Sequence, residues 1–418
     1  MAQVGSLATP RVEDGIADAE RRGVSRNAFL PVAVALIALW GAGTAAAQSQ
    51  PPAPTATVPA PGGGASQAQA PTPPPPPDPT PVTPAPVNPV PAAPTTPVAP
   101  TARGINLDSW AGSAAARVAP SWPGLAGANL SRDATRGDLD TALGILTGAP
   151  HTSANPSAPL SVWAAHAAFI SALGLGPERL GIQKLSVDGG PALHMPANAG
   201  SEVLARELGF VYNQPSSRDV RERARRETIR LADLVYMLDR ARGVGSWQRA
   251  RLARYRTIHL PAMDAQRFAV VQAAVWQIGQ PYVWAGDWPK ATTGAPWGAQ
   301  AHGGFDCSGL VWWAFKGSAR PSEMSLGTGL RGRTADDMAW EDPAEKVPAT
   351  NLEAGDLVFF GPSGPTSKKG TISHTGISLG AGWVIHSSGS RGGPSISFLS
   401  EYWPSATAWG RHVAALGA

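Results

Sequence analysis

Four stretches of the chain differ in how apolar and polar residues follow one another. Residues 28–40 form an apolar run, and residues 51–100 show neither a helical nor a strand period. Between residues 104 and 257 apolar residues recur at helical spacing, whereas in residues 264–418 two helical segments are followed by short apolar runs between glycines. The pattern predicts an amino-terminal segment 1–47, a linker 48–103, a helical domain 104–257 and a mixed domain 264–418.

The segment 1–47 has the order of charges and apolar residues that is typical of a signal peptide. Arg21, Arg22 and Arg26 precede the apolar run, and three alanines at 45–47 follow it directly before Gln48. The uncharged stretch 28–47 also has the length that spans a bilayer, so an uncleaved membrane anchor is the alternative. Both interpretations predict that most of the chain leaves the cytoplasm, as a secreted or cell-wall protein.

Proline dominates the linker. Residues 51–100 contain 20 prolines, and Asp78 is the only charged residue among them. Such a stretch cannot bury a core and is expected to be extended, at about 3 Å per residue in polyproline II. We therefore expect a disordered spacer.

The helical domain contains three similar segments, at residues 131–148, 161–176 and 227–243. Each has a polar start, apolar residues at helical spacing, and a glycine at or near its end. They resemble, with low specificity, the S-layer-homology repeats that dock cell-wall polymers. Residues 218–256 carry twelve arginines and five acidic residues, so this domain is predicted to hold anionic wall polymers. A solvated helix face with internal ion pairs is the alternative. No motif predicts nucleic-acid binding.

In the mixed domain, one helix is expected at 265–279 and another directly after Cys307. Strands are expected at 357–360, 372–379 and 383–387, the last two joined by a hairpin at Gly380–Gly382. Helices followed by antiparallel strands predict an α+β fold.

Cys307 is the only cysteine, so it cannot form an intramolecular disulfide. It follows Asp306 and precedes Ser308, both of which can accept hydrogen bonds from the first N–H groups of a helix. At a helix start the unpaired N–H groups favour a thiolate, so a lowered pKa and a nucleophilic role are predicted. An inert buried cysteine is the alternative.

His374 and His386 lie twelve residues apart, on the two strands of the predicted hairpin. If the hairpin is symmetric about Gly380 the histidines are directly opposed, and if its centre lies one residue later they are diagonal neighbours. In both registers they share a face. A nucleophilic thiol needs a base, and the base needs a group that orients its ring, so Cys307, His374 and His386 can supply the three roles.

Six ordered motifs carry a resemblance to a known family. They are Gln280–Trp284, Phe305–Val311, Arg333–Thr334, Gly355–Phe360, Ser373–Ile377 and Ile385–Ser387. Together they resemble the NlpC family of bacterial cell-wall cysteine peptidases over about the last 150 residues. The resemblance implies a papain-like fold and cleavage of peptidoglycan stem peptides, commonly between D-γ-glutamate and a diamino acid.

The resemblance also implies roles for individual residues. Cys307 matches the nucleophile, His374 the base and His386 the orienting residue. Substrate-binding positions match Tyr282, Asp306, Ser308 and Arg333, and the Tyr282 hydroxyl is placed to help hold an oxyanion. No metal or organic cofactor is expected, and the expected partner is the stem peptide. Two alternatives stay open: an N-acetylmuramoyl-L-alanine amidase, and a wall-binding protein without catalysis.

Overall fold

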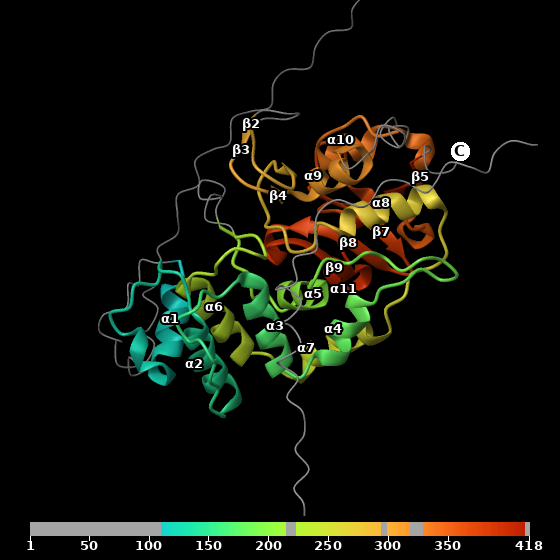
Figure 1. Cartoon of the computed structure of the whole chain (residues 1–418). Helices are drawn as coiled ribbons and strands as arrows, with labels where there is room; N and C mark the ends of the chain where they lie inside the picture. Colours follow the sequence, from blue (N-terminus) through green and yellow to red (C-terminus); the bar gives the residue numbers. More distant parts are fainter. Residues whose placement is uncertain (1–109, 215–222, 294–298, 318–328, 414–418) are drawn as a thin grey trace, which may run out of the picture. The chain divides into compact units, whose positions relative to one another are not determined.

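The amino-terminal part of the described chain is helical (Figure 1). The computed structural model describes residues 110–214, 223–293, 299–317 and 329–413, so the predicted segment 1–47 and linker 48–103 lie outside the described residues. Among the described residues no helix is long and apolar enough to cross a membrane. The α-helices of this part are α1 (Gly112–Val118), α2 (Arg136–Thr147), α3 (Val162–Ala172), α4 (Gly176–Gln183), α5 (Ala199–Glu207), α6 (Leu231–Arg242) and α7 (Ser246–Leu252).

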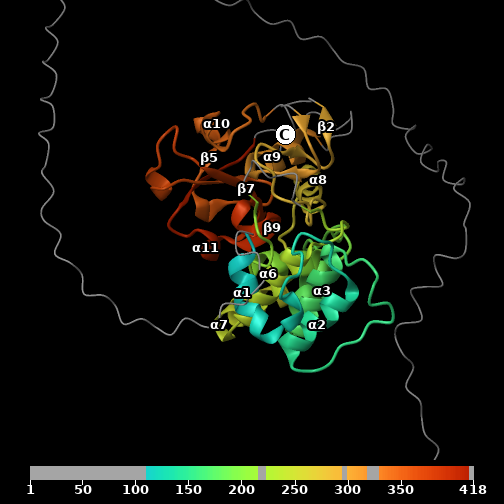
Figure 2. The ribbon, with the colours of Figure 1, turned by 90° about the vertical axis from the view of Figure 1, so that its left-hand side faces the viewer.

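The three similar segments form α2, α3 and α6, as predicted. Local signals explain the ends of α2, where Thr135 and Asp138 form a capping box and Gly148 ends the helix in the left-handed conformation, with φ 72°. Helices α1, α2, α3 and α6 pack together, and both views show them as one group (Figures 1 and 2).

A closed ring of backbone hydrogen bonds joins the three segments. The N–H of Ala134 donates to the carbonyl of Ile229 (2.8 Å), Ile229 donates to Leu160 (2.9 Å), and Leu160 donates to Ala134 (3.1 Å). Each of these residues stands two positions before its helix begins. The three segments are therefore structurally equivalent, which their sequence similarity indicated only loosely.

The carboxy-terminal part combines helices with an antiparallel sheet, in agreement with the predicted α+β class. Within the described residues the six-stranded sheet has the order β5-β10-β6-β7-β8-β9. Its strands are β5 (Lys346–Val347), β6 (Leu357–Phe360), β7 (His374–Gly380), β8 (Trp383–Ser388), β9 (Gly393–Phe398) and β10 (Thr407–Arg411). Helices α8 (Ala265–Val275) and α9 (Cys307–Trp312) pack against β7. The remaining helices are α10 (Ala335–Trp340) and α11 (Leu399–Tyr402). Two short ladders, β1 (Asp287–Trp288) with β4 (Gly304–Phe305) and β2 (Thr292–Thr293) with β3 (Ala299–Gln300), precede α9.

One hydrophobic core runs through both parts. Phe169 of α3, Leu204 of α5, Val271 of α8 and Ile377 of β7 belong to the same buried cluster. All nine residues of α5 are buried, and α5 packs against β9. Described residues on both sides of the predicted boundary between residues 257 and 264 therefore share one core.

Many arginines of the basic stretch are paired with other groups of the same chain. Their partners are carboxylates or backbone carbonyls, in the pairs Arg225–Ile278, Arg230–Asp233, Arg249–Leu173, Arg251–Glu207, Arg254–Glu401 and Arg256–Glu178. These contacts fit the alternative of internal pairing better than that of a wholly free basic face.

Candidate functional site

Cys307 is the first residue of α9, and the cap of this helix holds it in place. The Asp306 carboxylate accepts a hydrogen bond from the N–H of Gly309 (2.5 Å) and another from the Ser308 hydroxyl (3.2 Å). A Cβ at Gly309 would overlap the carbonyl of Gly286, so only glycine allows α9 to approach that loop. The predicted helix start at Cys307 is confirmed.

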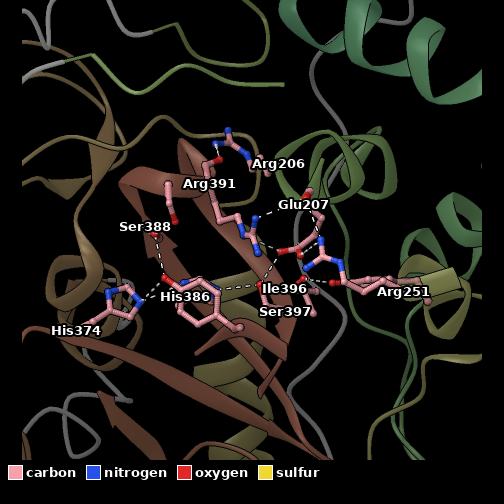
Figure 3. A network of polar contacts seen from close by, with 12 residues as sticks. Arg206, Glu207, Arg251, His374, His386, Ser388, Arg391, Ile396 and Ser397 are labelled. Atoms are coloured by element: carbon pink, nitrogen blue, oxygen red, sulfur yellow. Dashed lines mark hydrogen bonds and ion pairs between the residues drawn. The ribbon is translucent and has the colours of Figure 1, made fainter. Parts of the chain in front are cut away.

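The two predicted histidines meet on the sheet. Ile377 pairs with Ile385 and Ser378 with Val384, so the hairpin is centred one residue beyond Gly380 and the histidines are diagonal neighbours. His374 Nε2 and His386 Nδ1 lie 3.1 Å apart, with the rings nearly perpendicular at 87° (Figure 3). The second of the two predicted registers is therefore the one observed.

A further chain of contacts leads away from His386. Its Nε2 lies 3.0 Å from the Ser397 hydroxyl, which donates to a carboxylate oxygen of Glu207 (2.6 Å). Arg251 and Arg391 pair with the same carboxylate, at 3.1 Å and 3.2 Å (Figure 3). Sequence reasoning missed Ser397 and Glu207, because neither stands in a motif with a histidine.

Cys307 and His374 line a cavity of about 970 Å³. His386 does not line it and is fully buried behind His374. The four predicted substrate-binding residues, Tyr282, Asp306, Ser308 and Arg333, all line the same cavity. The structure thus brings together every predicted site residue.

Tyr402 is a cavity residue that no sequence signal indicated. Its hydroxyl donates to Ser388 (3.0 Å) and lies 3.5 Å from His374 Nε2, while its ring centroid is 4.0 Å from that of His386. Trp403 and Arg391 line the cavity beside it. These side chains share the cavity with Cys307 and His374.

Arg333 joins the acidic groups beside the thiol. Its guanidinium donates to the Ser308 hydroxyl (2.8 Å) and to the Ala285 carbonyl (2.9 Å), and it pairs with Asp306 and Asp287 at 3.4 Å each. Burial raises the pKa of both carboxyl groups although Arg333 acts against this. Arg333 therefore links several residues of the cavity wall through hydrogen bonds and ion pairs.

The predicted lowering of the thiol pKa is wrong in this structure. Burial raises the pKa of Cys307 to about 12, and the charge of Asp306 acts in the same direction; N–H groups of Thr375 and Ser308 and the charge of Arg333 oppose the rise. Burial also lowers the pKa of His374 to about 3 and that of His386 well below its usual value. Burial therefore disfavours the thiolate of Cys307 and the charged forms of both imidazoles.

Within the described ranges no three His, Cys, Asp or Glu side chains are grouped as metal ligands would be. A free thiol beside an imidazole whose ring is held by a second polar group is instead the arrangement that covalent acyl transfer requires. The site therefore places the Cys307 thiol and the His374 imidazole on one cavity, with a hydrogen-bonded chain behind the imidazole.

The region of the chain that carries this site is similar to known proteins. Residues 279–411 match the NlpC/P60 family. The murein DD-endopeptidase MepH of Escherichia coli is 36% identical over 129 residues, which are 30% of this chain and 38% of MepH. The gamma-DL-glutamyl hydrolase of Bacillus subtilis is 41% identical over 137 residues, 32% of this chain and 27% of that protein. The chain thus spans well under half the length of either relative.

A solved structure of the peptidoglycan hydrolase RipB from Mycobacterium tuberculosis is 30% identical, with a TM-score of 0.27, over 35% of this chain and 64% of that one. The six ordered motifs, the antiparallel sheet carrying both histidines, and the family match coincide in the same residues. Residues 279–411 of this chain are an NlpC/P60 domain.

Proposed function

We propose that the protein is an exported peptidoglycan hydrolase that cleaves amide bonds of the stem peptide as a cysteine peptidase. The observation that carries this proposal is the meeting of Cys307 and His374 in one cavity, with His386 held behind His374. The NlpC/P60 match and the named endopeptidases among the relatives support the substrate class. Action on the wall in turn requires export, which the segment 1–47 would provide as a signal peptide or anchor.

Because burial disfavours the charged forms of Cys307 and His374, a specific order of proton transfers follows. Because both charges are disfavoured before attack, His374 takes the thiol proton as Cys307 attacks the carbonyl, rather than in advance. The Cys307 N–H and the Tyr282 hydroxyl would hold the developing oxyanion. His374 then returns the proton to the leaving amine, and water hydrolyses the acyl-enzyme. His386 orients the His374 ring throughout.

The scissile bond is proposed to join D-γ-glutamate to the diamino acid. The relatives carry names for two different linkages, a DD-endopeptidase and a gamma-DL-glutamyl hydrolase, so similarity alone leaves the bond open. An amidase acting between muramic acid and L-alanine would use the same pair of residues. Digestion of defined muropeptides separates all three, because each bond yields fragments of a different mass.

The decisive experiment compares purified full-length protein with three variants on those muropeptides. Cys307→Ala and His374→Ala are each expected to abolish cleavage, while His386→Ala keeps a residue of it, because an orienting group contributes less than the nucleophile or base. Cleavage at the wild-type rate by Cys307→Ala would refute the mechanism. A wild-type protein that binds muropeptides without cleaving them would favour the wall-binding alternative.

The helical region is proposed to contact anionic wall polymers at one groove. Trp247 is 70% exposed, and the Arg251 guanidinium lies 5.7 Å from its ring centroid. Both residues line a cavity of about 520 Å³ together with Arg117 and Arg240, and with Asp239 and Glu207, the ion-pair partners of Arg117 and Arg251. Binding of the Cys307→Ala protein to purified walls should weaken with salt, since exposed charge pairs are screened over about 8 Å at physiological ionic strength. Loss of this binding in Trp247→Ala would support the groove, and undiminished binding would refute it.

A further inference from the structure

A row of buried polar side chains runs from the histidines into the helical region. His374, His386, Ser397 and Glu207 are joined by successive contacts of 3.1, 3.0 and 2.6 Å (Figure 3). Their exposed fractions are 6%, 0%, 1% and 5%. A hydrogen-bonded chain in so dry a setting is strengthened by the low local dielectric, so each member influences the next.

Glu207 is the last residue of α5 and lies outside the NlpC/P60 match. Two arginines from different elements hold its carboxylate, Arg251 of α7 and Arg391 of the loop after β8. The strand on which Ser397 lies is held from the helical side as well, because the Tyr255 hydroxyl donates to the carbonyl of Ile396 (2.7 Å). The carboxylate and the hydroxyl it accepts from are therefore both held in place.

The same helix also supports the rim of the cavity. Arg206, next to Glu207, donates to the backbone carbonyls of Arg391 (3.2 Å), Gly392 and Gln280 (3.0 Å). The loop that carries Arg391 lines the cavity. Helix α5 thus contacts the site at two points, the histidine chain and the rim.

The charge of Glu207 determines which group donates and which accepts in each hydrogen bond of the row. An ionised carboxylate can only accept, so Ser397 must donate to it and use its own oxygen to accept from His386 Nε2–H. A neutral His386 then has a bare Nδ1, which accepts from His374 Nε2–H. This leaves Nδ1 of His374 without a proton, as a general base requires.

We propose that Glu207 is a positioning residue of the candidate active site, acting through Ser397 on His386 and thereby selecting the tautomer of His374. The helical region then completes the catalytic machinery of the NlpC/P60 domain rather than serving only as an attachment. The kinetic consequence rests on the proposed function, whereas the tautomer selection does not.

A kinetic cycle tests the coupling. Glu207→Gln preserves shape, but its amide can donate to Ser397 as well as accept from it, so the direction of the row is no longer fixed. We expect kcat on muropeptides to fall about tenfold in Glu207→Gln and in Ser397→Ala, with KM unchanged. The double variant should be no slower than Ser397→Ala alone, because both changes break one row. The proposal would be overturned if the double variant lost kcat by the product of the two single losses, or if Glu207→Gln kept the wild-type kcat.

Glu178→Gln is the matched control. Glu178 is 1% exposed, lies on α4 in the same helical region, and pairs with Arg256 at 2.8 Å without any link to the histidines. It should lower the melting temperature as Glu207→Gln does and leave kcat within about twofold. If Glu207→Gln fails to fold, Ser397→Ala still tests the row, since it keeps Glu207 and both of its arginines.

A spectroscopic measurement tests the tautomers without any substrate. In ¹⁵N-histidine-labelled full-length protein, couplings between ring nitrogens and carbon-bound protons report which nitrogen carries the proton, and His374→Ala and His386→Ala assign the two rings. Both are expected as the Nε2–H form in the wild type and as mixtures in Glu207→Gln. Tautomers unchanged by Glu207→Gln would overturn the proposal. Should the wild type cleave no muropeptide, the proposed function fails and this measurement still decides the role of Glu207.

Discussion

Removing the Asp306 carboxylate should lower activity much more than it lowers the stability of the fold. Asp306→Ala deletes the cap that accepts from Gly309 N–H at 2.5 Å, which costs about 1 kcal/mol at a helix start. The lost contact with the Ser308 hydroxyl adds about 1 kcal/mol. Arg333 keeps Asp287, Ser308 and the Ala285 carbonyl, so the 3–5 kcal/mol typical of a broken buried pair does not apply in full.

The expected loss is therefore about 2 kcal/mol in unfolding free energy, or a melting temperature lower by roughly 4–8 °C for a unit of this size. Activity should fall more than tenfold, because the first turn of α9 carries the sulfur and is no longer held. Asp306→Asn keeps an acceptor and should lose about half as much stability. Calorimetry and muropeptide cleavage measure the two quantities.

Asp264→Ala provides the matched control. Asp264 caps α8 in the same way, accepting from Gln266 N–H (2.9 Å) and Arg267 N–H (2.8 Å), but it does not line the cavity. Its loss should destabilise the fold by about 1 kcal/mol without a change in kcat. The reasoning is refuted if Asp306→Ala keeps full activity, or if both variants lose activity in proportion to stability.

Three further outcomes are expected. Gly309→Ala should abolish cleavage even where the protein folds, because its Cβ would overlap the Gly286 carbonyl and push α9 outward; a variant with normal kcat would contradict this packing. Tyr402→Phe should lower kcat/KM less than tenfold and stability by about 1 kcal/mol, since the hydroxyl bond to Ser388 and the long 3.5 Å contact with His374 Nε2 are lost, and a greater drop in kcat would give the hydroxyl a direct role. Iodoacetamide should alkylate Cys307 slowly at neutral pH and faster as the pH rises beyond the usual cysteine range, because burial raises the thiol pKa to about 12 and so depletes the thiolate; a midpoint at or below about 8.5 would contradict that direction.

The identity of neighbouring residues in the sequence determined the helix ends and the strands on which the candidate site residues lie. Capping residues and glycines marked the ends of α2 and the start of α9, since helix termini are specified by neighbours within four residues. The even separation of His374 and His386 placed them on one face, because side chains alternate along a strand. These features need only backbone geometry, which is why they could be predicted without the structure.

Helix α5 shows where local order stops being informative. It mixes Ser201, Glu202, Arg206 and Glu207 with apolar residues, yet all nine of its residues are buried, so its sequence gives no sign that its polar side chains are enclosed. The equivalence of three segments was likewise clear only once Ala134, Leu160 and Ile229 closed a ring of hydrogen bonds.

Tertiary structure alone decided the surroundings of the site. Glu207 stands 190 residues before Ser397, and packing of α5 on β9 brings them to 2.6 Å. The direction of the Cys307 pKa also depended on the fold, because desolvation by distant elements outweighed the N–H groups at the start of its own helix. Sequence thus specified which groups could react, while long-range burial specified their protonation and what holds them in place.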